Sequence, residues 1–424
     1  MNITTKKYDL AVAGGGFAGI AAALAAARGG LKVILAERGN CLGGAAVTGL
    51  INPFMYYWTM VDGEPKYLCA GIFREILDEL SGAGGLGEDG STFDEEMLKL
   101  ILNRMAVKAG IDLLYHSYLF GADVSVNKDG KTLSHITVAN KSGCMDIPAD
   151  YFIDATGDAD LAAVSDFPFR LGREADSLCQ PMTLCFRLMN VDAEKYRSTH
   201  EQITPLYQKY QKEGKIKNIR EDVLIFDTLT DGVLHFNSTR VVRKNPTDAF
   251  DITAAEIEAR EQVFELHGFL KENFDAFRDS KIMMTAPQIG VRESRMIDGE
   301  YILTGQDLVS CVKFGDSIAA GNYDIDIHNP EGSGTSHCYF PQGVHYTIPY
   351  RSLIPKDSMN LLVAGRCISA THEAQASIRV IPIVCCIGEA AGTAAAIACR
   401  DNVPVGKADV SKLQNTLSAN GAFF

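Results

Sequence analysis

Two groups of residues in this chain have types and spacings that could support chemistry. The first is a set of three glycines, Gly14, Gly16 and Gly19, followed by the acid Glu37. In such a pattern the first glycine permits a tight turn, the second lets the backbone approach a pyrophosphate, and the third lets a helix pack against a strand. A carboxylate about twenty residues further on can accept a hydrogen bond from a ribose hydroxyl. The spacing therefore predicts a dinucleotide site.

The second group consists of cationic side chains in the last third of the chain: Arg292, His345, Arg351, His372 and Arg379. Arginines bind carboxylates through paired hydrogen bonds, and a histidine can carry a proton near neutral pH. His372 and Arg379 rank first because charged candidates cluster between Arg351 and Arg379. The alternative is structural, since the arginines could pair with Glu293, Glu373 or Glu389 and only hold the protein together.

Strands and a helix must position these residues. Residues 8–13 are an apolar strand, an alanine-rich helix follows Gly19, and residues 32–37 form a second strand that ends at Glu37. Residues 151–158 form another apolar strand that ends in Ala155-Thr156-Gly157-Asp158, and residues 360–366 form a late one that ends in Gly365-Arg366. Parallel strands that end in glycine deliver backbone groups to a bound cofactor.

The regular alternation of strand and helix stops near residue 166 and resumes near residue 355. We therefore predict a dinucleotide-binding domain whose first part covers residues 1–165 and whose completing part covers residues 355–424. Residues 166–354 mix strand-like and helical stretches, which indicates an inserted α+β substrate or cap domain.

The composition excludes several classes of protein. The 424 residues are 46% hydrophobic and 22% charged, as in soluble globular proteins of about two domains. The net charge of -13 argues against a nucleic acid or an anionic membrane as partner. The apolar residues 380–399 contain Pro382 and Glu389, which favours a buried core helix over a membrane span.

The cysteines indicate no metal site. There are eleven, none in a Cys-x-x-Cys pair, and the closest pair is the adjacent Cys385 and Cys386. Zinc and iron–sulfur sites built on cysteine need local pairs of thiolates. We expect reduced thiols and a cytoplasmic protein.

Several motifs together carry a resemblance over nearly the whole chain. They are Gly14-x-Gly16-x-x-Gly19 with Glu37, Leu42-Gly43-Gly44-Ala45, Asp154 to Asp158, Arg292-Glu293-Ser294-Arg295, and the block of residues 364–372 continued by 377–392. With them the chain resembles the FAD-dependent oxidoreductases of the glutathione-reductase-like superfamily, and most of all the family that includes the flavin subunit of heterodisulfide reductase. It lacks the iron–sulfur motifs of that subunit.

The resemblance implies FAD as cofactor, an α/β fold with a Rossmann-like FAD/NAD(P)-binding domain of three-layer ββα architecture, and a helix that starts near Gly388 and points its amides at the flavin. Many relatives have an aspartate that holds a ribityl hydroxyl where this chain has Arg366. That contact would then come from Asp158 or Glu389, or Arg366 would hold the pyrophosphate. The cofactor-binding residues implied are Gly14, Gly16, Phe17, Ala18, Gly19, Glu37, Arg38, Gly43, Gly44, Ala45, Ala155, Thr156, Gly157, Asp158, Gly365, Arg366, Gly388, Glu389, Ala390 and Ala391.

The predicted function is transfer of hydride or electrons between bound FAD and a small metabolite, which the arginines would suit if it is anionic. The catalytic candidates His345 and Arg351 lie in residues 343–351, and His372 and Arg379 in 366–379. Both segments should line the active site where the domains meet, with Arg292 and Arg295 approaching from the cap. Two alternatives stay open: an electron-transfer subunit that feeds a partner protein, and a non-redox enzyme that uses FAD structurally. A homo-oligomer is compatible with the sequence.

A second glycine fingerprint for a pyridine nucleotide is missing from the sequence. Gly84-Gly85-Leu86-Gly87 lies in a polar loop with no apolar strand before it. We therefore expect no dedicated NADPH domain.

Overall fold

A computed structural model describes residues 3–424, and its largest element is an eight-stranded sheet. The strand order is β6-β3-β2-β9-β8-β7, and β1 and β20 also pair with β9. The strands are β1 (Ile3–Thr4), β2 (Tyr8–Ala13), β3 (Val33–Ala36), β6 (Asp112–Leu114), β7 (Tyr118–Asn127), β8 (Gly130–Asn140), β9 (Gly143–Asp154) and β20 (Leu361–Val363).

One long strand, β9, belongs to two parts of this sheet. Its second half pairs in parallel with β2 on one side and β20 on the other, with Ile153 opposite Val12 and Leu362. Its first half pairs antiparallel with β8, which forms a long hairpin with β7. The antiparallel β7–β8–β9 meander is therefore continuous with the parallel sheet.

Alternate residues of β2 face two different layers. Leu10 and Val12 join the apolar cluster that contains α1 (Phe17–Arg28) and α11 (Ile381–Asp401). Ala11 and Ala13 join a second cluster with Ile136 of the meander. This period of two is what a strand buried on both faces requires. Helices, parallel sheet and meander form three layers, so the predicted fold class is confirmed.

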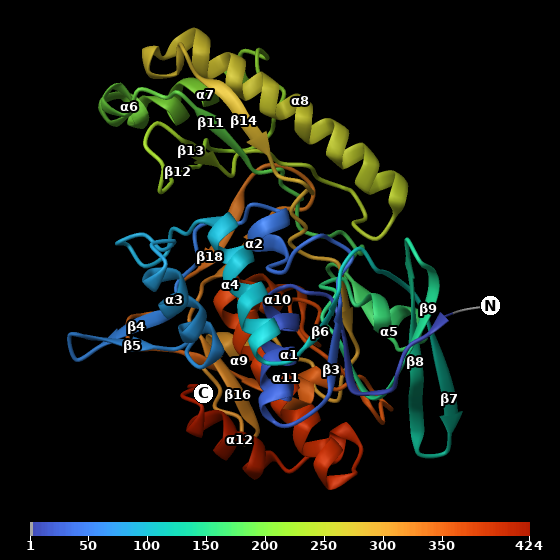
Figure 1. Ribbon diagram of the computed structural model, residues 1–424. Coiled ribbons are helices and arrows are strands. Elements are labelled where there is room, and N and C mark those ends of the chain that lie inside the picture. Colours follow the sequence, from blue (N-terminus) through green and yellow to red (C-terminus); the bar gives the residue numbers. More distant parts are fainter. Residues whose placement is uncertain (1–2) are drawn as a thin grey trace.

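The helices α1 and α11 lie side by side, blue and red in Figure 1. A Cβ atom at Gly388 would lie 2.1 Å from the carbonyl oxygen of Ala18, and one at Gly392 would lie 2.0 Å from that of Ala22. Among the described residues, α11 is the one helix long and apolar enough to cross a membrane, and its apolar window is completely buried inside the protein. The prediction of a core helix is confirmed.

Smaller elements complete this part of the molecule, which we call the sheet domain. The 14-residue helix α4 begins where Asp94 accepts hydrogen bonds from the amides of Glu96 and Met97, which fits an N-cap. The remaining elements are α2 (Ala45–Thr48), β4 (Trp58–Val61), β5 (Glu64–Tyr67), α3 (Ile72–Gly82), α4 (Glu95–Lys108), α5 (Asp160–Val164), α10 (His372–Ile378), η4 (Val405–Lys407) and α12 (Val410–Ala419).

A second unit, which we call the cap (residues 182–289), stands above the sheet domain in Figure 1. Its antiparallel sheet has the order β12-β13-β11-β14, and its own core includes the stacked rings of Phe186 and Phe236, 4.7 Å apart. The cap elements are β11 (Phe186–Met189), α6 (Ala193–Thr199), η1 (His200–Gln202), α7 (Ile203–Lys212), β12 (Ile225–Asp227), β13 (Leu234–Phe236), α8 (Ala249–Asn273), η2 (Asp275–Phe277) and β14 (Lys281–Thr285).

The segment after the cap packs on the sheet domain. Leu303, Ile318 and Ile348 belong to the same apolar cluster as α11. The elements here are α9 (Gly305–Val309), β16 (Ser317–Gly321), β17 (Ile325–His328), β18 (Thr335–Cys338), β19 (Tyr346–Pro349) and η3 (Tyr350–Leu353), while β10 (Phe169–Leu171) pairs with β15 (Arg295–Ile297). The boundaries at 166 and 354 remain a prediction, and this packing favours a shorter cap.

Candidate functional site

The turn between β2 and α1 is built by close backbone contacts. Gly14 has φ +98°, and a Cβ atom there would lie 2.4 Å from the carbonyl oxygen of Ala155. A Cβ atom at Gly19 would lie 1.8 Å from the carbonyl oxygen of Gly14. At Gly16, the nearest atom to a Cβ would be the Cα of Gly44, 3.8 Å away. Gly14 and Gly19 are thus required by packing, whereas Gly16 leaves an open space at the start of α1.

Glu37 is fixed beside this turn. Its two carboxylate oxygens accept hydrogen bonds from the amides of Gly15 and Gly39, both at 2.6 Å. A carboxylate has about four acceptor positions. The side chain therefore keeps acceptor capacity for a hydroxyl group.

These elements line one cleft, which we call the cofactor cleft, with an empty volume of about 990 Å³. The ends of β2, β9 and β20 meet there, and the cap side contributes residues 288–291. The predicted cofactor-binding residues that line it are Gly14, Gly16, Phe17, Ala18, Glu37, Arg38, Gly43, Gly44, Ala45, Ala155, Thr156, Gly157, Asp158, Gly365 and Arg366.

An ion pair lies at the middle of the cleft. Arg366 donates through Nη2 to Asp158 Oδ1 at 2.6 Å, and the Ser294 hydroxyl donates to the same oxygen at 2.6 Å. Burial acts to raise the pKa of Asp158, but Arg366 and Ser294 hold it below its usual value. The Nε of Arg366 is buried and has no hydrogen-bond partner in residues 3–424. Arg366 therefore retains a donor for a ligand.

Five predicted cofactor contacts lie outside the cleft. Helix α11 begins at Ile381, about two turns before Gly388, so the predicted helix start is wrong. Pro382 in the first turn marks that start, and Arg379, Ile381 and Val384 line the cleft instead. The five residues serve helix packing or the core. Gly19 and Gly388 allow the close backbone contacts described above, and Ala390 and Ala391 belong to the apolar cluster. Glu389 accepts a hydrogen bond from the amide of Ile72 at 2.9 Å.

Comparison with known proteins decides the family. A family model described as FAD dependent oxidoreductase matches residues 9–417. The chain belongs to the FAD dependent oxidoreductase family. No curated protein sequence matches significantly.

Solved structures align with nearly the whole length of this family member at low identity. A geranylgeranyl bacteriochlorophyll reductase-like protein from Thermoplasma acidophilum is 12% identical (TM-score 0.46; 98% of this chain and 83% of that chain covered). The p-nitrophenol 4-monooxygenase PnpA from Pseudomonas putida DLL-E4 is 10% identical (TM-score 0.48; 99% and 89%). A flavoprotein/dehydrogenase from Cytophaga hutchinsonii is 13% identical (TM-score 0.46; 97% and 84%). TM-scores below 0.5 indicate neither a substrate nor a reaction for this chain.

FAD is the cofactor, and the cleft fits it. The start of α1 presents backbone amides beside the open space at Gly16, which suits a pyrophosphate. Gly365, with φ +108°, gives a second approach without a side chain, and Arg38 and Arg366 supply positive charge. Glu37 would hold the adenosine ribose, and Arg366 or Asp158 would meet the central part of FAD.

Beyond the FAD cleft lies a buried group of charges around Asp326. Its Oδ2 atom accepts hydrogen bonds from Arg379 Nη2 at 3.1 Å and from the Tyr323 hydroxyl at 3.1 Å, and lies 3.2 Å from Nε2 of His328. Burial acts to raise the pKa of Asp326, but His328 and Arg379 hold it well below its usual range. Asp326 is therefore an anion that fixes Arg379 at the rim of the cleft.

His328 is held neutral inside this group. Its Nδ1 lies 2.9 Å from Arg240 Nη2, and because arginine can only donate, Nδ1 is the acceptor and Nε2 carries the proton toward Asp326. Burial and the charge of Arg292 lower the pKa of His328 to about 3.

Arg292 lies nearby, partly buried, and donates to the carbonyl of Pro181 at 2.7 Å and to the Thr183 hydroxyl at 2.6 Å. Burial and the neighbouring charges of Arg379 and Arg220 lower its pKa to about 9. Arginine stays protonated at neutral pH, so the lowered pKa means that burial and the two neighbouring cations disfavour the charge of Arg292. Nε of Arg379 and Nη1 of Arg220 are also buried without a hydrogen-bond partner in the described chain.

His372 is not at the FAD cleft. Its Nδ1 lies 2.7 Å from Glu293 Oε1, while the other oxygen of Glu293 accepts from the amide of Gln180 at 2.8 Å. His372 lines a separate open cavity together with Arg173 and Thr371. This placement supports the structural alternative for His372, and its role as proton carrier stays a prediction.

His345 and Arg351 of residues 343–351 do not line the FAD cleft, and their role at the active site stays a prediction. The ring of His345 packs on Phe423, and Arg351 is half exposed and paired with Asp316 at 2.9 Å. They precede the return to the sheet domain in sequence, but β19 pairs with β16, and neither strand contributes a residue to the lining of the FAD cleft.

Sequence reasoning missed Asp326, the residue that organises the charged group. Its signal was available: Asp324, Asp326 and His328 alternate with isoleucines, which places three polar side chains on one face of a strand. Cys41 is buried, and burial raises the pKa of its thiol, which makes it a poor nucleophile.

Proposed function

We propose that this FAD-dependent oxidoreductase transfers hydride or electrons between FAD and a small anionic molecule that binds beside Arg379. The supporting observation is a group of three arginines. Arg292 has no ion pair within the described residues. Arg379 and Arg220 are each paired with one aspartate but keep a buried nitrogen without a hydrogen-bond partner in residues 3–424. Buried donors without partners are costly, and a carboxylate or similar anion would satisfy them. Arg379 connects this charge to the FAD cleft because its side chain lines that cleft.

Bound FAD supplies the hydride chemistry. Asp326 keeps the Arg379 guanidinium in one orientation, which leaves its Nε donor for the substrate. Arg292, held by the Pro181 carbonyl and the Thr183 hydroxyl, adds a fixed positive charge. Two rigid cations would orient an anion better than flexible surface groups could.

The test is anaerobic reduction of the flavin in the purified holoenzyme by a panel of small carboxylates and their neutral amides. We expect carboxylates to bleach the flavin and amides to fail. Arg379→Ala should lower kcat/KM for the best carboxylate about 30- to 100-fold, the equivalent of a lost hydrogen bond to a charged group. Arg379→Lys should recover part of that loss.

Arg351→Ala is the matched control, since it removes an arginine that lies outside the cleft. The proposal of an anionic substrate would be contradicted if carboxylates and their amides reduced the flavin equally well and Arg379→Ala kept the kcat/KM of the parent. If no small molecule of the panel reduces the flavin, the result would favour the alternative of an electron-transfer subunit that feeds a partner protein. It would also favour the resemblance to the flavin subunit of heterodisulfide reductase. The cytoplasmic location remains a prediction.

A further inference from the structure

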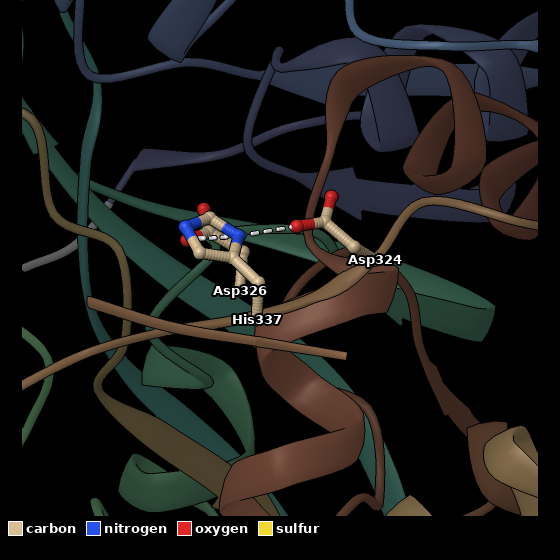
Figure 2. Close-up of side chains that lie close together, drawn as sticks. All are labelled: Asp324, Asp326 and His337. Carbon is tan, nitrogen blue, oxygen red and sulfur yellow. Dashed lines mark hydrogen bonds and ion pairs between the residues drawn. The ribbon is translucent and has the colours of Figure 1, made fainter. Parts of the chain in front are cut away.

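The β17–β18 hairpin carries three ligand-type side chains on one face. Asp326 in β17 is directly opposite His337 in β18. Asp324 directly precedes β17, and its carboxylate lies beside the His337 ring. Figure 2 shows the two carboxylates and the imidazole ring converging.

The distances in this group are short enough to share one ion. Nδ1 of His337 lies 2.5 Å from Oδ2 of Asp324 and 3.8 Å from Oδ1 of Asp326. One ligand atom from each residue lies within 4.8 Å of the others. Small side-chain shifts would bring all three to the 2.0–2.2 Å bonds that zinc makes with nitrogen and oxygen.

One atom of the group lacks a partner. Asp326 is only 6% exposed, and its Oδ1 has no hydrogen-bond partner within residues 3–424. The other oxygen, Oδ2, is the one engaged by Arg379, His328 and Tyr323. A buried carboxylate oxygen normally has a donor, and this one is directed at His337 instead of at the arginine. The hairpin therefore has an unsatisfied acceptor where a cation would lie.

We propose that Asp324, Asp326 and His337 bind a divalent transition-metal ion. Two carboxylate oxygens and one imidazole nitrogen suit Mn²⁺, Fe²⁺ or Zn²⁺ better than Mg²⁺ or Ca²⁺, which prefer oxygen alone. Asp324 and Asp326 bring two negative charges to the ion, and Asp326 shares its charge with Arg379. Arg379 does not occupy the site, because it contacts the opposite oxygen of Asp326.

The site is accessible and adjoins the cleft. The His337 side chain is 36% exposed, which gives an ion a route from solvent. Asp326 would contact the metal through one oxygen and Arg379 through the other. A bound metal ion would neutralise part of the negative charge of Asp326. The positive charge of Arg379 would then be less compensated and would attract an anion more strongly.

The experiment measures metal binding directly, with the FAD-loaded protein after treatment with a chelator. Mn²⁺ is titrated in and the free ion is followed by electron paramagnetic resonance; Zn²⁺ is titrated by calorimetry. We expect one ion per chain. His337→Gln and Asp324→Asn should each weaken binding at least tenfold, as the loss of one ligand requires.

His200→Gln is the matched control, because His200 is an exposed histidine of the cap. FAD content and thermal unfolding of each variant establish that it is folded. Absence of stoichiometric binding of both ions to the folded protein would overturn the site, as would unchanged binding by His337→Gln. The metal titrations use no substrate. The proposal of a metal site and the proposal of an anionic substrate can therefore be refuted independently.

Discussion

Two glycines of the same fingerprint meet different physical demands. A side chain at Gly19 would collide with the turn that precedes α1, so this residue is needed for folding whether or not FAD is present. A side chain at Gly16 would project into free space in the cleft, so this residue matters when FAD is bound. The spacing of the glycines predicts both positions but does not separate the two roles.

We therefore predict opposite behaviour for two substitutions. Gly16→Glu should give a folded, colourless protein, because a carboxylate would lie against the pyrophosphate, whereas the parent carries one FAD per chain. Gly19→Ala should fail to fold or lose most of its stability, since its Cβ would lie 1.8 Å from a carbonyl oxygen. Flavin absorbance, circular dichroism and thermal unfolding distinguish the outcomes.

Gly82→Ala serves as the control for the glycine variants, because no atom lies within 4 Å of the added Cβ. A yellow Gly16→Glu protein with stoichiometric FAD would show that the cleft has been assigned wrongly.

At the scale of elements, the contact between α11 and α3 contains a buried acid. Glu389 is 1% exposed and accepts a hydrogen bond from the amide of Ile72 at the start of α3. Burial raises its pKa from 4.5 to about 7, although that hydrogen bond acts in the opposite direction. The folded protein thus keeps a proton on Glu389 at pH values where the unfolded chain has lost it.

This linkage gives a stability that falls as pH rises. Below about pH 4.5, Glu389 is protonated in both the folded and the unfolded protein, so it adds no pH dependence to the free energy of unfolding. Between pH 4.5 and 7 the folded protein binds more protons than the unfolded chain, so the free energy of unfolding falls as the pH rises. Each pKa unit corresponds to about 1.4 kcal/mol, so the full loss is about 3 kcal/mol. Glu389→Gln removes it. The stability of this variant relative to the parent should therefore rise by about 2.5 kcal/mol from pH 5 to pH 8, since a small part of the loss falls below pH 5.

Denaturant unfolding at both pH values measures this change, and Glu64→Gln at an exposed position of β5 should show none. A difference that stays constant with pH would mean that Glu389 is ionised in the folded protein.

Elements set by local pattern were predictable from the sequence, and long-range contacts were not. The β2–α1–β3 unit with Glu37 follows from a few adjacent residues. The start of α11 was misplaced because Gly388 was interpreted as a contact to the flavin, whereas it allows close packing on Ala18. The pairs Arg379–Asp326 and His372–Glu293 join residues more than fifty positions apart, and nothing in one sequence specifies such partners.

At the scale of the molecule, one parallel sheet dominates. In residues 3–424, the other sheets contain antiparallel pairs. The glycines around Gly84 follow the helix α3 rather than a strand, which is not the arrangement of a dinucleotide fingerprint.

We predict that the holoprotein binds no second dinucleotide. Titration with NADPH should show no stoichiometric binding by calorimetry, and reduction of the flavin by NADPH should be slower than reduction by the true donor. Tight binding of one NADPH beside a retained FAD would contradict this, because it requires a second nucleotide site.

The late strand β20 has a consequence for the synthesis of the protein. It is the partner of β9 at Phe152, Ile153 and Asp154, and α11 is the cover for the alanine face of α1. The ribosome synthesises the chain from the N-terminus. The β9 strand therefore emerges before its partner β20, and the apolar face of α1 emerges before α11, which covers it. Both wait until residues 361–401 have been made. Such exposed edges and faces favour aggregation, and the FAD cleft itself lacks Gly365 and Arg366 until β20 has been made.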